Sequence, residues 1–181
     1  MRRAAVVLAL AGCVIAPAMP GPAPTPAIDP ARARGQALLT SVLASPDLDG
    51  RPLAADARGT ATVVVVFASW CPHCKDEIAI LDGLRARHPG LRVLGVNYRG
   101  HEEYDGRGDA LAVRAYVRDH APWMPVVPAD DALYAQLGRP SKIPTIYVWD
   151  RGGDLVEIYD RRVRALPTAA ELDALLARLG A

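Results

Sequence analysis

The sequence predicts an α/β fold in which a mixed β-sheet lies between helices, and three patterns indicate it. Residues 62–68 form a continuous run of β-branched and other apolar residues, typical of a strand covered on both faces. Residues 71–87 follow with apolar side chains at helical spacing, and a second apolar strand at 91–98 completes a βαβ start. The C-terminal part has the pattern of two short strands and a helix, which gives the sheet an antiparallel side.

The N-terminal segment 1–18 has the pattern of an export signal. Two arginines precede an apolar run at 4–11, which is too short to span a membrane. Residues 10–13 (Leu-Ala-Gly-Cys) resemble the lipobox of bacterial lipoproteins, which implies cleavage before Cys13 and a lipid on its sulfur. The alternative is ordinary cleavage after Ala18. Either way we expect an exported protein of the bacterial periplasm or cell envelope, with Cys13 as the candidate for a lipid anchor in the membrane.

The segment between this signal and the sheet is rich in proline. Residues 17–30 contain six prolines among small residues and suit neither a helix nor a central strand. We interpret residues 19–35 as a semi-rigid linker, the alternative being a disordered leader. The globular domain then covers residues 36–181. Residues 32–45 are weakly helical or irregular, and the Asp-Gly pair within 47–51 predicts the turn of an N-terminal β-hairpin.

The elements after the second strand are predicted from their boundaries. Residues 99–108 are polar and Gly-rich, so we expect a loop. Asp109 can cap a helix that reaches His120, and Thr168 can cap a last helix with a stripe of leucines. Between them we expect a short extended piece at 124–127, a short helix at 130–137, and strands at 145–149 and 155–159 around a tight turn.

The composition excludes several classes of protein. The chain has 181 residues, of which 51% are apolar and 23% charged, as in an ordinary globular domain. Lys and Arg total 21 and Asp and Glu total 20, so there is no basic excess that would indicate nucleic acid as a partner. Three cysteines are too few for a disulfide-dense mini-protein, and a domain of this size folds without such bonds. Any cysteine pair is therefore available for chemistry.

Cys71 and Cys74 lie at the junction between the buried strand and the helix that follows it. Two intervening residues on a first helical turn bring the sulfurs close enough for an easily exchanged disulfide. At the helix N-terminus, free N–H groups and the helix dipole stabilise a thiolate on Cys71, whereas Cys74 lies one turn further in and is more buried. We therefore predict that Cys71 is the attacking nucleophile and Cys74 the resolving thiol, and we expect no cofactor besides this redox-active disulfide.

Other interpretations of the pair are weaker. A structural zinc site needs four ligands, and the histidines at 88, 101 and 120 show no ligand spacing, so we predict no metal site. Covalent haem attachment needs histidine where Lys75 stands. Two charged clusters, 101–105 and 161–164, could suggest a metal site and a surface for an acidic partner or lipid, respectively. We interpret both as solvated.

Several features in order resemble one protein family. They are the stretch 67–74 (Phe-Ala-Ser-Trp-Cys-Pro-His-Cys), Glu77 three residues after the second cysteine, a βα unit formed by 95–98 and the helix from Asp109, and the segment 142–153. With these features the chain resembles thioredoxin-fold proteins of the TlpA/ResA type, exported bacterial thiol-disulfide oxidoreductases, from about residue 47 to 179. The resemblance implies a thioredoxin fold with an inserted βα unit, in addition to the predicted hairpin.

The resemblance also implies roles for single residues. The Ile143–Pro144 bond would be cis, with Pro144 facing the disulfide and the backbone of Ile143 free to pair with a substrate strand; the alternative is a trans proline that opens an edge strand. Trp70 would be part of the docking surface, or else ordinary half-buried packing. Glu77 would be a buried or half-buried carboxylate that accepts a proton near Cys74, or else a solvated helix acid.

The chain departs from related patterns at two places. One concerns the proton acceptor, and the other leaves the direction of the reaction open, because the family implies a reductase. Thioredoxins proper carry a buried aspartate where this chain has Val65, which increases the importance of Glu77. The dipeptide Pro72-His73 is like that of strongly oxidising DsbA-type proteins, and His73 can favour the Cys71 thiolate, which makes a stronger oxidant.

The sequence as a whole favours an exported thiol-disulfide oxidoreductase. A reductase of the TlpA/ResA type is the first hypothesis, with protein substrates that carry cysteine pairs, such as an apocytochrome, and with a membrane redox partner. The alternatives are a DsbA-like oxidant or isomerase, and a module that holds Cu(I) through the two thiolates in metalloprotein assembly.

Overall fold

The computed structural model describes residues 29–53, 56 and 58–181. The predicted signal, the lipidation candidate Cys13 and the linker up to residue 28 lie outside the described residues. Within the described part of the chain, no helix has both the length and the apolar character needed to cross a membrane.

A five-stranded mixed sheet forms the centre of the described structure, with the strand order β3-β2-β1-β4-β5. The strands are β1 (Thr62–Phe67), β2 (Arg92–Tyr98), β3 (Val126–Ala129), β4 (Thr145–Trp149) and β5 (Leu155–Tyr159). β1 pairs in parallel with β2 and antiparallel with β4, while β3 adds in parallel to β2 and β5 antiparallel to β4. The predicted mixed sheet is therefore confirmed.

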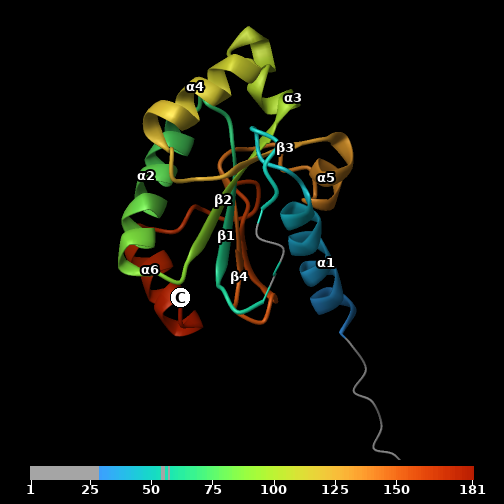
Figure 1. The fold of residues 1–181 in the computed structure, drawn as a ribbon. Helices are drawn as coiled ribbons and strands as arrows, with labels where there is room; N and C mark the ends of the chain where they lie inside the picture. Colours follow the sequence, from blue (N-terminus) through green and yellow to red (C-terminus); the bar gives the residue numbers. More distant parts are fainter. Residues whose placement is uncertain (1–28, 54–55, 57) are drawn as a thin grey trace, which may run out of the picture.

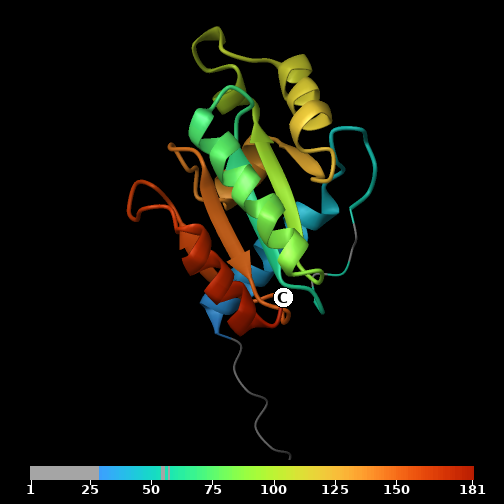
Figure 2. The same cartoon turned by 90° about the vertical axis from the view of Figure 1, so that its left-hand side faces the viewer.

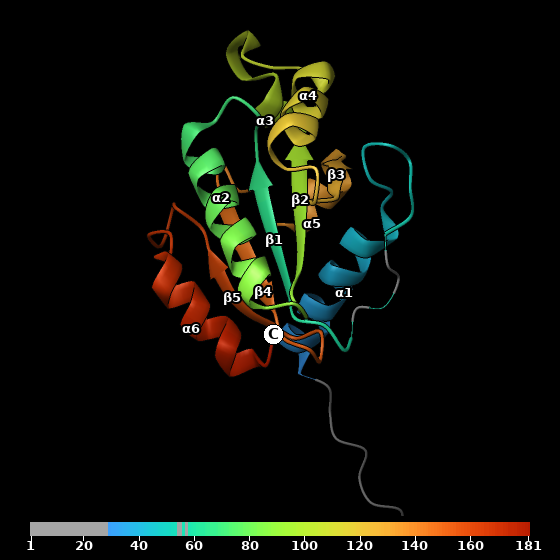
Figure 3. The same cartoon turned by 60° about the vertical axis from the view of Figure 1, so that its left-hand side comes forward.

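Helices cover both faces of this sheet (Figure 1). They are α1 (Pro30–Ala44), α2 (Pro72–Arg87), α3 (Arg99–Glu102), the 3₁₀ helix η1 (Tyr104–Gly106), α4 (Ala110–His120), α5 (Asp131–Gln136) and α6 (Ala169–Leu179). α2 and α6 lie side by side on one face (Figure 2), and α1 covers the opposite face (Figure 3). The helix predicted from Asp109 to His120 is confirmed as α4, and its Asp109 cap accepts two N–H groups of the first turn.

Strand β1 shows why the sheet needs helices on both sides. All six of its residues are buried. Val63 and Phe67 belong to the core under α2, α4 and α6, whereas Val64 and Val66 belong to the core under α1 and α5. A strand with apolar side chains on both faces is stable only when both faces are covered.

The predicted N-terminal β-hairpin is wrong. Residues 47–51 do form a turn, in which the Asp47 carboxylate accepts the N–H groups of Asp49 and Arg51 at 2.8 Å. No strand flanks this turn in the described residues. The N–H of Leu48 instead donates to the carbonyl of Val126 at 2.8 Å, so the turn is attached to the edge strand β3. An aspartate that binds its own turn stabilises a loop without needing paired strands.

Helix α1 is longer than the sequence pattern indicates. It begins at Pro30 with Asp29 as its cap, so residues 30–35 of the predicted linker are helical instead. Its stability comes from packing, because Val42 is fully buried and the indole N–H of Trp149 donates to the carbonyl of Gly35 at 2.9 Å. A Cβ at Gly35 would lie 2.7 Å from the Cβ of Leu155, so only glycine allows this close approach.

Candidate active site

The two cysteines lie where β1 ends and α2 begins. Cys71 is the cap residue of α2, Pro72 occupies the first turn, and Cys74 lies on the buried side of the helix. Both cysteines are free thiols. Cys71 is 4% exposed and Cys74 is fully buried, so Cys71 is the thiol nearer to solvent, as the spacing predicts.

The surroundings of the two thiols separate their acidities. The backbone N–H of Cys74 donates to the Cys71 sulfur at 3.3 Å. The hydrogen bond from the Cys74 side chain has the largest effect and, with backbone N–H groups and the charge of Arg161, lowers the pKa of Cys71 to about 7, although burial acts against it. Burial raises the pKa of the Cys74 thiol. Cys71 therefore ionises first, which suits a nucleophile.

His73 acts on Cys71 differently from the sequence-based expectation. Its side chain is exposed on the outer face of the first turn of α2. Its backbone N–H lowers the pKa of Cys71. In the described part of the chain, no hydrogen bond joins the His73 ring to the cysteine.

The segment before β4 faces the nucleophile. The Ile143–Pro144 bond is cis, as expected, and Pro144 is buried. The carbonyl oxygen of Ile143 lies 4.0 Å from the Cys71 sulfur. This places the backbone beside cis-Pro144 against the reactive thiol.

The backbone of Ile143 is only partly free, which corrects the expectation for this residue. Its carbonyl accepts a hydrogen bond from Nη1 of Arg161 at 2.9 Å. Its N–H has no hydrogen-bond partner among the described residues. Arg161 is half-buried, so the interpretation of 161–164 as a solvated cluster fails at this residue. Sequence reasoning missed Arg161 because it stands in one charged run with Arg162 and Arg164, and nothing in the sequence distinguishes the half-buried residue from its two exposed neighbours.

Glu77 is buried about one helical turn after the resolving cysteine. It is 3% exposed and lies three positions after Cys74 on the same buried face of α2. Burial raises the pKa of Glu77 to about 7. Its Oε1 atom has no hydrogen-bond partner within the described structure. An uncompensated buried carboxyl that titrates near neutral pH can accept and release a proton.

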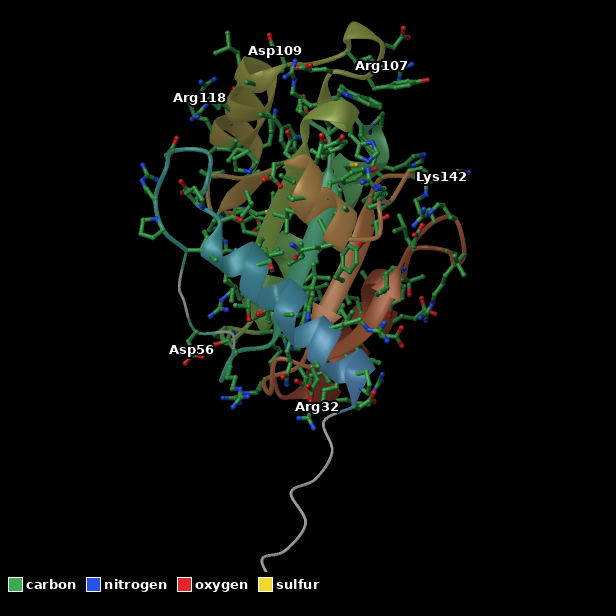
Figure 4. All side chains as sticks on the ribbon, turned by 90° about the vertical axis from the view of Figure 1, so that its right-hand side faces the viewer. Arg32, Asp56, Arg107, Asp109, Arg118 and Lys142 are labelled. Atoms are coloured by element: carbon green, nitrogen blue, oxygen red, sulfur yellow. The ribbon has the colours of Figure 1, made fainter. Side chains whose placement is uncertain are left out.

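The segment 99–108 is not the predicted loop, because α3 and η1 form in it and contact the active site. Trp70 is half-buried, and its indole N–H donates to the carbonyls of Glu102 at 2.9 Å and His101 at 3.1 Å. The guanidinium of Arg107 lies over the indole, 4.9 Å from the ring centre. Arg107 lies near one end of the molecule and Arg32 near the other, with Lys142 between them (Figure 4).

Glu102 corrects the interpretation of 101–105 as solvated. It is 2% exposed, and its carboxylate accepts hydrogen bonds from the Ser69 N–H at 2.9 Å, the Ser69 hydroxyl, and the Asn97 amide at 2.7 Å. Sequence reasoning missed this residue. Asn97 was the available signal, because a polar side chain inside an apolar strand needs a hydrogen-bond partner.

The described residues contain no group of three or more His, Cys, Asp or Glu side chains placed to hold a metal ion. Val65 is fully buried in β1 with apolar neighbours from α2 and β4. A proton therefore has no acceptor at this strand position, and Glu77 is the buried carboxyl that α2 offers near the pair.

Comparisons with known proteins bear on the fold and on a short segment of the sequence. No family model matches the sequence. A segment of 55 residues is 44% identical to the thiol:disulfide interchange protein DsbE of Allochromatium vinosum, but it spans only 30% of this chain and 27% of that protein.

Solved structures match over a larger part of the chain. A secreted Mycobacterium tuberculosis disulfide oxidoreductase homologous to E. coli DsbE is similar with a TM-score of 0.62 and 21% identity, covering 78% of this chain and 98% of that one. A thioredoxin-family thiol:disulfide interchange protein from Chlorobium tepidum is similar with a TM-score of 0.61 and 23% identity, covering 75% of this chain and 91% of that one. StoA from Bacillus subtilis is similar with a TM-score of 0.55 and 19% identity, covering 72% of this chain and 92% of that one. The thioredoxin-like fold predicted from the sequence is thereby confirmed.

Proposed function

We propose that this chain is a thiol-disulfide oxidoreductase that exchanges the Cys71–Cys74 pair with protein substrates carrying cysteine pairs. The observation that supports this most directly is the difference in acidity between the two thiols. Cys71 has a pKa of about 7 at the N-terminus of α2, whereas burial raises the pKa of Cys74. Such a pair has one ready nucleophile and one thiol held in reserve.

The reaction proceeds in two exchange steps. The Cys71 thiolate attacks one sulfur of a substrate disulfide, that bond breaks, and the leaving sulfur takes up a proton as a mixed disulfide forms. Cys74 then loses its proton, for which Glu77 is the acceptor, and attacks the Cys71 sulfur. The substrate leaves with its second thiol. The substrate disulfide gains two electrons and Cys71–Cys74 becomes a disulfide; an oxidase runs the same steps in reverse.

Substrate docking uses the surface around Cys71. The N–H of Ile143 is the backbone group available to an added substrate strand, since Arg161 occupies the carbonyl. Trp70 directly precedes Cys71 and is held by its two indole hydrogen bonds, and its exposed part is the apolar contribution to this surface.

We further propose that the protein is exported to the cell envelope and acts there as a reductase of the TlpA/ResA type, recharged by a membrane redox partner. The local identity with a DsbE protein and the fold of a secreted oxidoreductase support this setting. The N-terminal pattern of residues 1–18 supports export independently, with a lipid anchor at Cys13 as the finer form of the proposal.

The first experiment is the reduction potential of the Cys71–Cys74 pair, measured by equilibration in thiol buffers and alkylation. Thioredoxin lies at about −270 mV and DsbA at about −120 mV. We expect a value near the lower end, which is that of a reductase. A value near the upper end would instead support a protein that donates disulfides. If the pair forms no disulfide at any redox potential of the thiol buffer, the proposed function is contradicted.

A further inference from the structure

Arg161 reaches the active site from the segment that connects β5 to α6. Its Nη1 donates to the Ile143 carbonyl at 2.9 Å, and the same oxygen lies 4.0 Å from the Cys71 sulfur. One backbone oxygen is therefore shared between a cation and the reactive thiol. Arg161 lies 18 residues after Ile143, so this contact depends on the fold and not on a local turn.

Arg161 differs from the neighbouring arginines in the partner of its charge. Arg162 pairs with Asp160, and Arg164 pairs with Glu157 at 2.5 Å. In the part of the chain that the structure describes, no carboxylate lies within salt-bridge distance of Arg161. A half-buried guanidinium without a counter-ion is unusual, because desolvated charges are normally paired. A thiolate on Cys71 is the anion that this site can supply.

We infer that Arg161 is a positioning residue for thiol-disulfide exchange, which holds the Ile143 carbonyl and places a positive charge beside Cys71. The inference rests on the proposed function. The carbonyl oxygen is the negative end of a dipole, so facing Cys71 alone it would oppose ionisation of the thiol. By donating to this oxygen, Arg161 offsets the dipole and leaves a net attraction for the thiolate.

This arrangement also has a consequence for the resting thiol. When Cys71 is protonated, its sulfur can donate weakly to the Ile143 carbonyl, and that contact is lost on ionisation. Arg161 keeps the oxygen satisfied in both states, so the segment before cis-Pro144 need not move when the nucleophile ionises. Arg161 thereby keeps the docking segment in place through the reaction.

The test compares Arg161→Met and Arg161→Lys with the matched control Arg164→Met, which removes a charge from the same segment but from a residue already paired with Glu157. The readout is the pKa of Cys71, from the pH dependence of its alkylation. We expect Arg161→Met to raise this pKa and to leave about threefold less thiolate below the pKa, because the charge of Arg161 has a smaller effect than the hydrogen bonds from Cys74. Arg161→Lys should retain most of the effect, and Arg164→Met should match the wild type.

Two results would overturn the inference. One is an unchanged pKa in Arg161→Met, and the other is an equal shift in Arg164→Met, which would indicate net charge and not position. If Arg161→Lys keeps the pKa of Cys71 low, the shift in Arg161→Met results from the lost charge and not from a folding defect. Disulfide reduction by the wild type is measured alongside. If the wild type exchanges no substrate disulfide, the proposed function fails. The inference fails alone if the wild type exchanges normally and the pKa of Cys71 is unchanged in Arg161→Met.

Discussion

The backbone N–H of Ser69 donates to the buried carboxylate of Glu102 at 2.9 Å across 33 residues of sequence. The Ser69 hydroxyl and the Asn97 amide donate to the same carboxylate. Ser69 directly precedes Trp70, whose indole donates to the Glu102 carbonyl. One residue of α3 therefore joins the ends of β1 and β2 and fixes the chain just before the nucleophile.

Replacing Glu102 by leucine should destabilise the protein. The carboxylate accepts hydrogen bonds at both oxygens, and leucine leaves the buried Ser69 N–H and the Asn97 amide without this acceptor. A buried donor left without its partner costs about 1–3 kcal/mol, so we expect a loss of about that size in the free energy of unfolding, measured by urea denaturation. Glu103→Leu is the control, because the Glu103 side chain makes only an exposed salt bridge with Arg99 and its replacement should change stability by less than about 1 kcal/mol. Equal losses in the two variants would contradict this account.

The parts of the structure that sequence reasoning predicted correctly depend on local patterns. The strand at 62–67 is β-branched at five of its six positions, Thr62 to Val66, so no other element suits it. The cysteine pair follows from its spacing on the first turn of α2. Asp109 and Thr168 were identified as caps from residue type alone, and the structure has both as caps.

The residues that sequence reasoning missed act through distant partners. Glu102 lies in a Gly-rich polar stretch, and its donors belong to the ends of two other elements. Arg161 lies among exposed arginines, and its partner carbonyl precedes a different strand. A polar residue is classed as solvated when its own neighbours are polar, so a single buried member of such a cluster leaves no periodic signal.

The two cysteines should fail in different ways when replaced. Cys71→Ser removes the nucleophile, so reduction of an insulin disulfide should fall to the uncatalysed rate. Cys74→Ser leaves Cys71 able to attack but unable to be released, so mixed disulfides with the substrate should accumulate and be visible on non-reducing gels. Full activity of Cys71→Ser would show that another group is the nucleophile.

The reactivity of Cys71 should follow its lowered pKa. Its alkylation rate should rise with pH through a midpoint near 7, whereas an ordinary thiol has its midpoint at about 8.5. Cys74→Ala should move the midpoint upward, because the hydrogen bond from the Cys74 side chain has the largest effect on the thiolate. Peptide mapping after labelling separates Cys71 from the other cysteines. A midpoint that stays near 7 in Cys74→Ala would show that the backbone N–H groups of α2 and Arg161 determine it without the Cys74 side chain.

Glu77 should make the stability of the protein fall as pH rises. Its pKa is raised from 4.5 to about 7, so between these values the unfolded chain ionises while the folded protein keeps the proton. The folded state then binds more protons, and the free energy of unfolding decreases through this window by about 1–3 kcal/mol. Glu77→Gln should remove this decrease, as measured by urea denaturation at several pH values.

Glu77→Gln also tests whether Glu77 transfers a proton, separately from its effect on stability. If Glu77 accepts the proton of Cys74, Glu77→Gln should slow the resolution of the mixed disulfide by at least about tenfold and leave the alkylation rate of Cys71 unchanged. Asp76→Asn is the matched control, since Asp76 is the exposed neighbour on α2 and should affect neither quantity. Stability that still falls between pH 4.5 and 7 in Glu77→Gln would assign the titration to another group. Normal resolution in that variant would leave Glu77 with a purely structural role, because a proton acceptor cannot be removed without slowing the step it serves.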